Sequence, residues 1–203
     1  MLPKMSNAIS LRKDPIMPSP RTFSLKYPGW FERRQDVRRK LDRINNGIWE
    51  SEEEQIDYLR TVFGAVGENL YFLEPVSFVN GKNIFIGDHV FINSNVTFID
   101  AVPIEIGDHT MIAPGCVITT VDHPKQPGER RGFTSRAQAI KIGRDVWIGA
   151  NCTIFPGVTI GDNVIIGSNS VVNKDIPSNT VAFGSPARPH RAIEDDTGDA
   201  PGA

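Results

Sequence analysis

The chain has 203 residues, with 22 basic and 24 acidic side chains and a formal net charge of −2. This length suits one main domain with one substantial core. A nearly balanced charge gives no overall field that would favour a nucleic acid or an anionic membrane as a partner. No apolar run is long enough for a signal peptide or a membrane-spanning helix, so we expect a cytoplasmic protein.

The chain opens with a polar, proline-rich segment without periodicity, residues 1–25, which predicts a disordered arm. A helical segment, residues 26–68, is expected next, because apolar residues recur there at helical spacing in two runs. The members of these runs are Trp30, Val37, Leu41 and Ile44, then Ile56, Leu59, Phe63 and Val66. Asn46-Gly47 is a typical stop for the first run. We predict that the helical pair covers the open end of the domain that follows, with its many arginines forming a solvated face.

From residue 86 onward the dominant pattern is a period of six, which fits neither a helix nor a simple alternating strand. The repeating aliphatic positions are Ile86, Ile92, Ile106, Ile112, Ile142, Ile148, Ile154, Ile160, Ile166 and Val172. Short β segments joined by regular corners produce such a period, and three segments make a triangular coil of eighteen residues. Stacked coils bond through their backbones, and β-branched side chains fill the interior. The pattern therefore predicts a mainly β domain, a parallel β-helix over residues 69–190.

The period of six breaks twice before it settles. Fourteen residues instead of twelve separate Ile92 from Ile106, which predicts a bulge near residues 98–103 that redirects side chains outward. Further on, continuing the period would place proline and arginine side chains in a dry interior. Residues 119–140 must therefore leave the β-helix as a loop, and a long loop on a rigid scaffold is a common place for function. The acidic, glycine-containing end, residues 191–203, predicts a disordered tail.

The two cysteines, Cys116 and Cys152, lie 36 residues apart, which is two coils of eighteen. At roughly 4.8 Å for each coil, their Cα atoms would be about 9.5 Å apart, too far for a disulfide. Neither cysteine belongs to a metal-binding pair. We therefore expect both to be reduced core residues.

Several segments together carry a resemblance to a known family. They are NIFIGDHVFINSNVTFID (83–100), PIEIGDHTMIAPGCVI (103–118), the His-Pro pair in the loop, and the stretch from KIGRDVWIGA through KDIP to SPAR (141–188). Over roughly residues 72–191 the chain resembles the maltose, galactoside and nodulation acetyltransferases of the hexapeptide superfamily. The resemblance implies a left-handed β-helix, a known exception to the right-handed rule for parallel crossovers.

The same resemblance implies an activity and a set of site residues. It implies acetyl-CoA as the acetyl donor, a small-molecule hydroxyl acceptor, no catalytic metal, and a homotrimer whose donor groove lies between neighbouring chains. It makes His123 the catalytic base and places Asn93 and Asp100 beside the acceptor. The residues that it places along the coenzyme A groove are Trp147, Ala150, Ser168, Asn173, Lys174, Arg188 and Arg191. Lysine and arginine in such a set suit the phosphates of coenzyme A.

The expected chemistry needs one well-placed base. When an alcohol attacks a thioester, its proton must be removed as the oxygen attacks, and such a base contributes roughly 10²–10⁴ in rate. The family's loop usually carries a glutamate that orients the histidine, whereas this chain has Ser135 there. Another group, such as a main-chain carbonyl, is therefore expected to fix the ring of His123. A sugar is the nearest acceptor by resemblance, while serine, an amino sugar and an antibiotic hydroxyl stay open.

Two functions of other classes also stay open. Corner residues His89 and His109, joined by His123, would give three histidines for zinc, as in the γ carbonic anhydrases that share this architecture. That interpretation leaves the coenzyme A-type segment without a role. The second alternative is a non-catalytic assembly module in which the repeat is only a scaffold.

Overall fold

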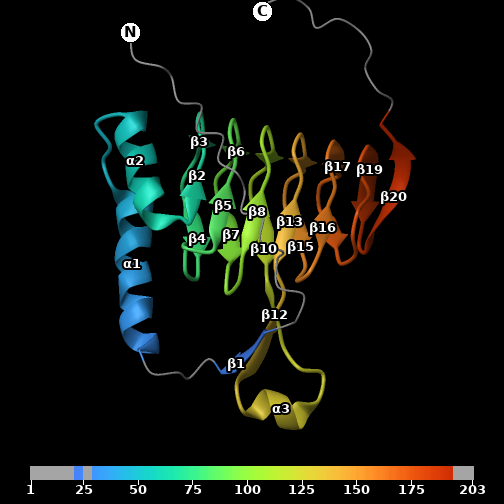
Figure 1. The fold of residues 1–203 in the computed structure, drawn as a ribbon, viewed down its shortest axis with the longest axis horizontal. Helices are drawn as coiled ribbons and strands as arrows, with labels where there is room; N and C mark the ends of the chain where they lie inside the picture. The colour runs from blue at the N-terminus through green and yellow to red at the C-terminus, as the bar shows by residue number, and fades with distance from the viewer. Residues whose placement is uncertain (1–20, 25–28, 194–203) are drawn as a thin grey trace, which may run out of the picture.

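The computed structural model describes residues 21–24 and 29–193, and most of them form a stack of triangular coils (Figure 1). The first face holds β2 (Ala65–Val66), β5 (Ile84–Ile86), β8 (Ile104–Ile106), β13 (Ile140–Ile142) and β16 (Thr159–Ile160). The third face holds β4 (Val76–Phe78), β7 (Val96–Ile99), β10 (Val117–Thr119), β15 (Thr153–Ile154) and β18 (Val171–Val172). Strands within each of these faces are parallel. The predicted parallel β-helix is confirmed.

The second face is longer and ends in a hairpin. It holds β3 (Tyr71–Phe72), β6 (Phe91–Ile92), β9 (Met111–Ile112), β14 (Trp147–Ile148), β17 (Val164–Ile166), β19 (Thr180–Gly184) and β20 (Ala187–Ala192). All pairs are parallel except the last, in which β20 turns back antiparallel on β19. Strand β20 reaches Ala192, so the disordered tail expected from residue 191 is wrong for its first residues, while 194–203 lie outside the described residues.

The core lies inside the coils, where the period of six places its isoleucines. Ile84, Ile104 and Ile140 pair in register on the first face and are fully buried. Burying one such side chain stabilises the fold by roughly 1.5–3 kcal/mol. The repeat therefore encodes both the strand register and the hydrophobic interior.

Coil length differs between the two halves of the β-helix. Upstream of the loop, Phe85 pairs with Glu105, so a coil takes twenty residues; downstream, Lys141 pairs with Thr159, so a coil takes eighteen. The two extra residues stand between the third and first faces. The loop of residues 119–140 leaves from this same corner, which we call the third–first corner. The predicted eighteen-residue coil is confirmed directly downstream of the loop, while the last coil, in which Ile165 pairs with Val181, takes sixteen residues.

The two cysteines occupy neighbouring coils, because β10 pairs directly with β15. Much of the 36-residue separation is taken up by the extruded loop, so the predicted spacing of two coils is wrong. Both cysteines are free and buried, and each thiol donates to a backbone carbonyl at 3.2 Å. The adjacent Cys152 thiol and burial together raise the pKa of Cys116 above its usual range.

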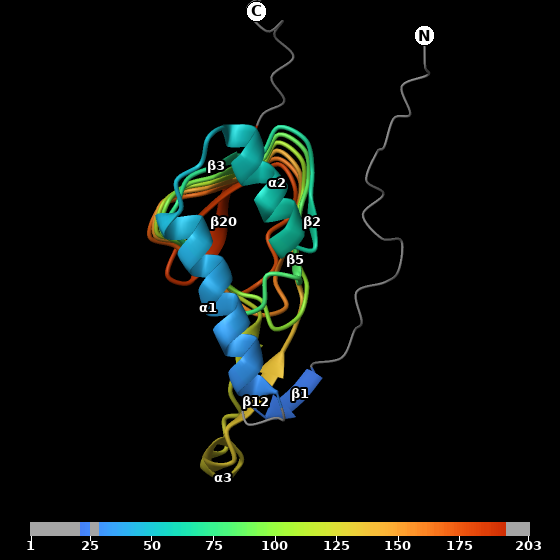
Figure 2. The ribbon, with the colours of Figure 1, turned by 90° about the vertical axis from the view of Figure 1, so that its left-hand side faces the viewer.

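Two helices, α1 (Trp30–Asn46) and α2 (Glu52–Val62), lie across the first coil (Figure 2). Ile44 of α1 and Leu59 of α2 are fully buried. The Asn45 amide exchanges two hydrogen bonds of 2.9 Å with the Val76 backbone, which fixes α1 against the third face. The predicted helical cover is confirmed. Neither α1 nor α2, nor any other helix within residues 21–24 and 29–193, is long and apolar enough to cross a membrane.

The boundary between the helices and the β-helix lies earlier than expected. Helix α2 ends at Val62, so Phe63 and Val66 are outside it, and Val66 belongs to β2. The β-helix therefore begins at residue 65 instead of 69. Val66 also starts the period of six that continues through Phe72 and Phe78, all three of which are buried.

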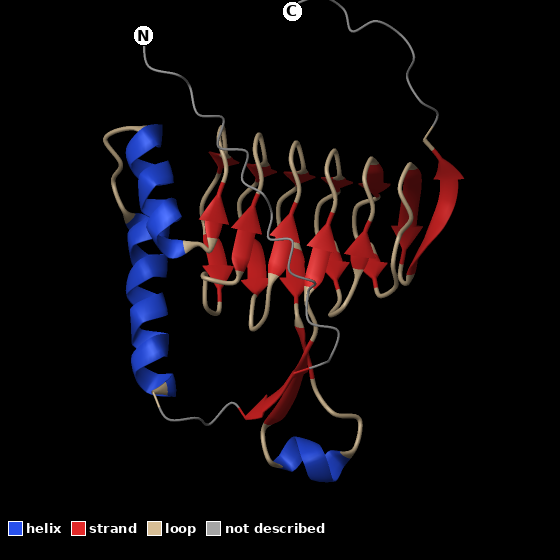
Figure 3. Cartoon of the chain, viewed as in Figure 1, coloured by secondary structure: helices blue, strands red, loops and turns tan. Residues whose placement is uncertain are grey.

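The extruded loop forms an ordered hairpin that projects from the β-helix (Figure 3). It consists of β11 (Val121–Asp122), α3 (Pro127–Arg131) and β12 (Thr134–Ala137). A strand from the start of the chain, β1 (Arg21–Ser24), pairs antiparallel with β12. The expectation of a disordered arm is therefore wrong for residues 21–24, while residues 1–20 and 25 lie outside the described residues.

Candidate active site

The hairpin that carries His123 is held in shape by its own polar side chains. The Arg130 guanidinium donates to the main-chain carbonyls of Pro124 and Lys125 at 3.0 and 2.6 Å. The Glu129 carboxylate pairs with Arg136 at 2.9 Å and ties α3 to β12. Both interactions bracket the turn that follows His123. The backbone around the histidine is thereby fixed although it lies outside the β-helix.

The imidazole of His123 is exposed and has a defined tautomer. Its Nδ1 lies 3.1 Å from the carbonyl oxygen of Thr134. Because a carbonyl only accepts hydrogen bonds, Nδ1 carries the proton of this bond, and in the neutral ring Nε2 then keeps its lone pair. The hydroxyl of Ser135, which is fully buried, lies 3.5 Å from the same nitrogen. A main-chain carbonyl therefore holds the ring, as expected in the absence of a glutamate.

Asp100 lies inside the third–first corner and not on the surface. Its Oδ1 accepts the backbone N–H groups of Val79 and Asn80 at 2.9 and 2.8 Å, and its side chain is fully buried. Desolvation raises the pKa of this carboxyl group. The prediction that the inserted residues turn side chains outward is wrong at Asp100, because its side chain turns inward to bind backbone N–H groups at the same corner of the preceding coil. The Asp100 carboxylate binds the turn instead of facing the groove where an acetyl acceptor was expected.

Asn93 lies at another corner, between the second and third faces. Its side-chain oxygen accepts the N–H of Ser94 at 2.8 Å, and the residue is half-buried. Strand β7, four residues or roughly 13 Å long at about 3.3 Å for each residue, separates this second–third corner from the third–first corner. Within one chain, Asn93 and His123 therefore belong to different edges of the β-helix.

The residues expected along the coenzyme A groove divide between the same two edges. Ala150 and Ser168 follow Asn93 down the second–third corner, and Trp147 stands beside them on the second face, 51% exposed. Asn173 and Lys174 lie at the third–first corner, below the hairpin.

The last coil adds two arginines to this set. Arg188 of β20 donates to the Asn173 side chain at 3.3 Å, which brings it to the third–first edge. Arg191 is exposed on β20 and pairs in register with Val181. Both cations are therefore available on the outer surface.

His89 and His109 mark the remaining corner, between the first and second faces. Their rings stack at 4.8 Å with an interplanar angle of 4°, and both residues are exposed with positive φ. His123 contacts Thr134 instead of joining them. Across the described part of the chain, no group of three or more His, Cys, Asp or Glu side chains is placed to hold a metal ion.

The sequence predicts that a main-chain carbonyl holds His123 but not that it is the carbonyl of Thr134, and it does not predict strand β1. The carbonyl of Thr134 is a backbone group, so its role leaves no residue signature. Strand β1 has only four residues and pairs across more than a hundred positions. The fold and site together define an enzyme built on a β-helix, with one exposed histidine presented on a hairpin.

Comparison with known proteins agrees with this class. The family model "Bacterial transferase hexapeptide (six repeats)" matches residues 139–174, and "Hexapeptide repeat of succinyl-transferase" matches residues 83–120. The galactoside O-acetyltransferase of Lactococcus lactis is 36% identical over 82% of this chain and 80% of its own length.

Solved structures give the same relationship. A maltose O-acetyltransferase from Clostridium difficile 630 superposes with a TM-score of 0.83 at 38% identity, covering 87% of this chain and 94% of that one. A hexapeptide-repeat acetyltransferase from Vibrio cholerae, solved with acetyl-CoA, has a TM-score of 0.79 at 37% identity, covering 85% and 93%. The chain belongs to the hexapeptide-repeat acetyltransferase family and is an acyltransferase.

Proposed function

We propose that this protein transfers the acetyl group of acetyl-CoA to a hydroxyl group of a small molecule, and that the acceptor is a sugar. The observation that carries the proposal is the exposed imidazole of His123, whose Nδ1 is engaged by Thr134 so that Nε2 is free to accept a proton. The relatives named for acetyl transfer to galactosides and maltose, and the solved complex with acetyl-CoA, support the donor and the acceptor class.

The reaction needs only one base on the protein. Nε2 of His123 takes the hydroxyl proton while the acceptor oxygen bonds to the thioester carbonyl carbon. The tetrahedral intermediate then collapses, the C–S bond breaks, and the imidazolium returns the proton to the coenzyme A sulfur. Backbone N–H groups are available to stabilise the oxyanion. A thioester is already activated, so a neutral imidazole is sufficient.

The division of the expected residues between two edges supports a shared active site. In a homotrimer, the third–first edge of one chain, with His123 and Arg188, would face the second–third edge of its neighbour, with Asn93 and Ser168. Each of the three grooves would then hold one acetyl-CoA and one acceptor. The phosphates of acetyl-CoA would be bound by Lys174, Arg188 and Arg191.

An outer column of the second face is suited to such an assembly. Tyr71, Phe91, Met111 and Trp147 follow one another in register across β3, β6, β9 and β14. Three of them are between 43% and 53% exposed in the single chain. A continuous apolar column of this kind marks a surface for contact with another molecule.

A screen of acceptors by thiol release from acetyl-CoA tests the proposal. Galactosides, maltose and glucose should give release well above the rate without acceptor, while serine, amino sugars and hydroxylated antibiotics should give less. Product mass should rise by one acetyl group on oxygen. Thiol release that is no faster with any hydroxyl acceptor than without one would contradict the proposal.

The zinc hydratase considered from the sequence has no support in these comparisons, and the three histidines are not gathered in the chain. A second function is therefore not proposed.

A further inference from the structure

Strand β12, whose Thr134 carbonyl binds the ring of His123, is the central strand of a small sheet outside the β-helix. The sheet order is β1–β12–β11. On one side, β12 pairs with β11 over only two positions, Val121 with Ala137 and Asp122 with Arg136. On the other side, β1 pairs with all four residues of β12. The N-terminal strand therefore makes the longer of the two ladders.

The position of His123 depends on β12. The Thr134 carbonyl that accepts the hydrogen bond from Nδ1–H and the buried Ser135 hydroxyl beside it both belong to this strand. Thr134 and Ser135 are also the residues opposite Ser24 and Phe23 of β1. A shift of β12 would move the hydrogen-bond acceptor of the imidazole and its neighbour together.

The hairpin needs this additional strand for physical reasons. A two-stranded hairpin is marginally stable in water, whereas three strands hold one another more firmly. Without β1, the backbone groups on one edge of β12 would also be left to solvent. Catalysis is sensitive to such looseness, because a misplacement of about 1 Å can cost on the order of 10² in rate.

We infer that strand β1 is a positioning element of the active site, which braces β12 so that the Thr134 carbonyl holds His123 in the tautomer with Nε2 free. The inference rests on the proposed function for its catalytic consequence. The bracing itself is a statement about structure and is tested without activity.

The first experiment observes the ring directly. Nitrogen-15 NMR of histidine-labelled protein should show the His123 ring protonated at Nδ1 in the full-length protein, with the assignment made by the signal missing in His123→Ala. Thr22→Pro combined with Phe23→Pro removes adjacent N–H groups, of which one must donate to β12. The Nδ1–H signal should then give way to a mixture of tautomers. An unchanged tautomer would overturn the inference whatever the activity.

The second experiment measures the catalytic consequence. The double proline variant should lower kcat about 10-fold, a smaller loss than that of His123→Ala, and leave KM for acetyl-CoA within about twofold. In the His123→Ala background the same prolines should cause no further loss, because both changes act on one group. A further loss of similar size in that background would mean that β1 does not act through His123.

A matched control separates bracing from other effects of proline. Ser6→Pro with Asn7→Pro lies upstream of the paired residues and should leave both the NMR signal and kcat unchanged. The melting temperature of every variant should match that of the unsubstituted protein, since none of the substitutions lies in the β-helix. If the full-length protein shows the Nδ1–H signal and its dependence on β1 but acetylates no hydroxyl acceptor, the proposed function fails while the bracing stands.

Discussion

Asp100 combines full burial with an incomplete set of hydrogen bonds. Its Oδ1 accepts two backbone N–H groups, while its Oδ2 is buried and has no partner among the described residues. Burial of a charged carboxylate without full pairing is costly, which is why desolvation raises its pKa. Asp100 stabilises the turn through its Oδ1, but burial of its charged form lowers the stability of the fold.

Replacing Asp100 by asparagine should therefore be tolerated near neutral pH. The amide oxygen can still accept from Val79 and Asn80, and no charge is buried. A raised folded-state pKa means that wild-type stability is greatest below the ordinary aspartate range, near pH 4, and declines as the pH rises toward the folded-state value. The unfolding free energy of Asp100→Asn relative to wild type should thus improve between pH 4 and pH 8, as measured by denaturant unfolding.

Asp100→Val provides the contrast, because it leaves the N–H groups of Val79 and Asn80 without an acceptor. It should destabilise the protein by roughly 2 kcal/mol or more at every pH. An Asp100→Asn variant that is less stable than wild type by a constant amount across this pH range would contradict the account of Asp100.

Single residues were predictable where a side chain interrupts the repeat. His123 stands out because proline and arginine around it cannot enter a dry interior, and His89 and His109 fall at corners by count. The direction of the Asp100 side chain was not predictable, because two inserted residues can bulge inward or outward. The inward direction is set by the backbone N–H groups of Val79 and Asn80, which need a hydrogen-bond acceptor. The partner of His123 was foreseen only as a kind of group, since any carbonyl in the loop is equivalent in the sequence.

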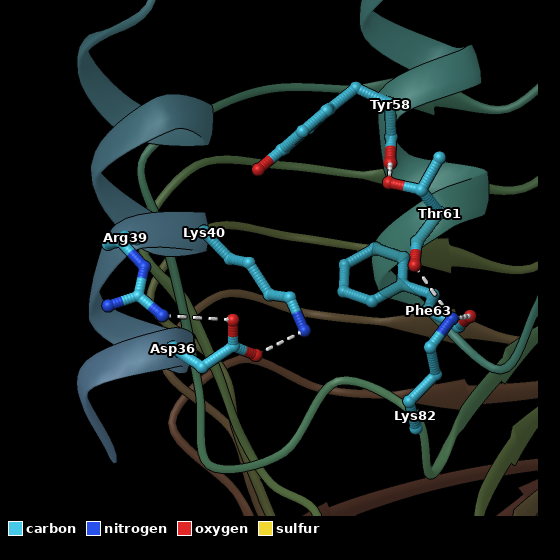
Figure 4. A network of polar contacts seen from close by, with 7 residues as sticks. All are labelled: Asp36, Arg39, Lys40, Tyr58, Thr61, Phe63 and Lys82. Atoms are coloured by element: carbon cyan, nitrogen blue, oxygen red, sulfur yellow. Dashed lines mark hydrogen bonds and ion pairs between the residues drawn. The ribbon is translucent and has the colours of Figure 1, made fainter. Parts of the chain in front are cut away.

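At the scale of elements, Lys82, which lies between β4 and β5, joins the β-helix to the C-terminal end of α2. Figure 4 shows the Lys82 ammonium reaching the carbonyl oxygens of Thr61 and Phe63, at 2.7 and 3.1 Å. A cation there binds helix carbonyls that lack partners and complements the helix dipole. In the same view, a hydrogen bond from Lys40 lowers the pKa of Asp36 on α1.

Lys82→Met should lower the unfolding free energy by roughly 0.5–1.5 kcal/mol, since two charge-assisted hydrogen bonds are lost while the aliphatic stem is kept. Lys141→Met is the matched control, because Lys141 is exposed on the outer side of β13. Denaturant unfolding of the two variants measures the difference. Equal effects of the two substitutions would show that Lys82 does not cap α2.

The end of α2 shows where element prediction fails. Phe63 and Val66 continue the spacing of Leu59 at four and three residues, which suits a helix. Val66 equally begins the period of six, and only the pairing of β2 with β5 decides between the two. The extra length of the upstream coils was visible at one place only, between Ile92 and Ile106, because the first coil has aromatic residues at its inner positions.

For the whole molecule, the main unpredictable feature is which distant segments meet. The pairing of β1 with β12 joins residues more than a hundred positions apart, and no local pattern marks it. The separation of the cysteines was misjudged for the same reason, since a loop of unknown length hides how many coils lie between them. The coil architecture was predictable because its contacts repeat.

The shared-groove proposal makes a prediction about assembly. If each site needs two edges from neighbouring chains, the active species should be a trimer of about 67 kDa, three times the 22.4 kDa chain. Light scattering coupled to gel filtration measures this mass. Tyr71→Glu with Met111→Glu, placed on the exposed apolar column, should give smaller species and lose activity in proportion. A fully active monomer would contradict the proposal.

The most direct test of the whole account is the turnover of His123→Ala at saturating acetyl-CoA and acceptor, with acetyl-CoA affinity measured by calorimetry on the same protein. Removing the proposed base from an intact hairpin should lower kcat by roughly 10²–10⁴ and leave donor affinity nearly unchanged. Turnover within about threefold of wild type, or a loss of donor affinity as large as the loss of turnover, would contradict the assignment of His123 as the base.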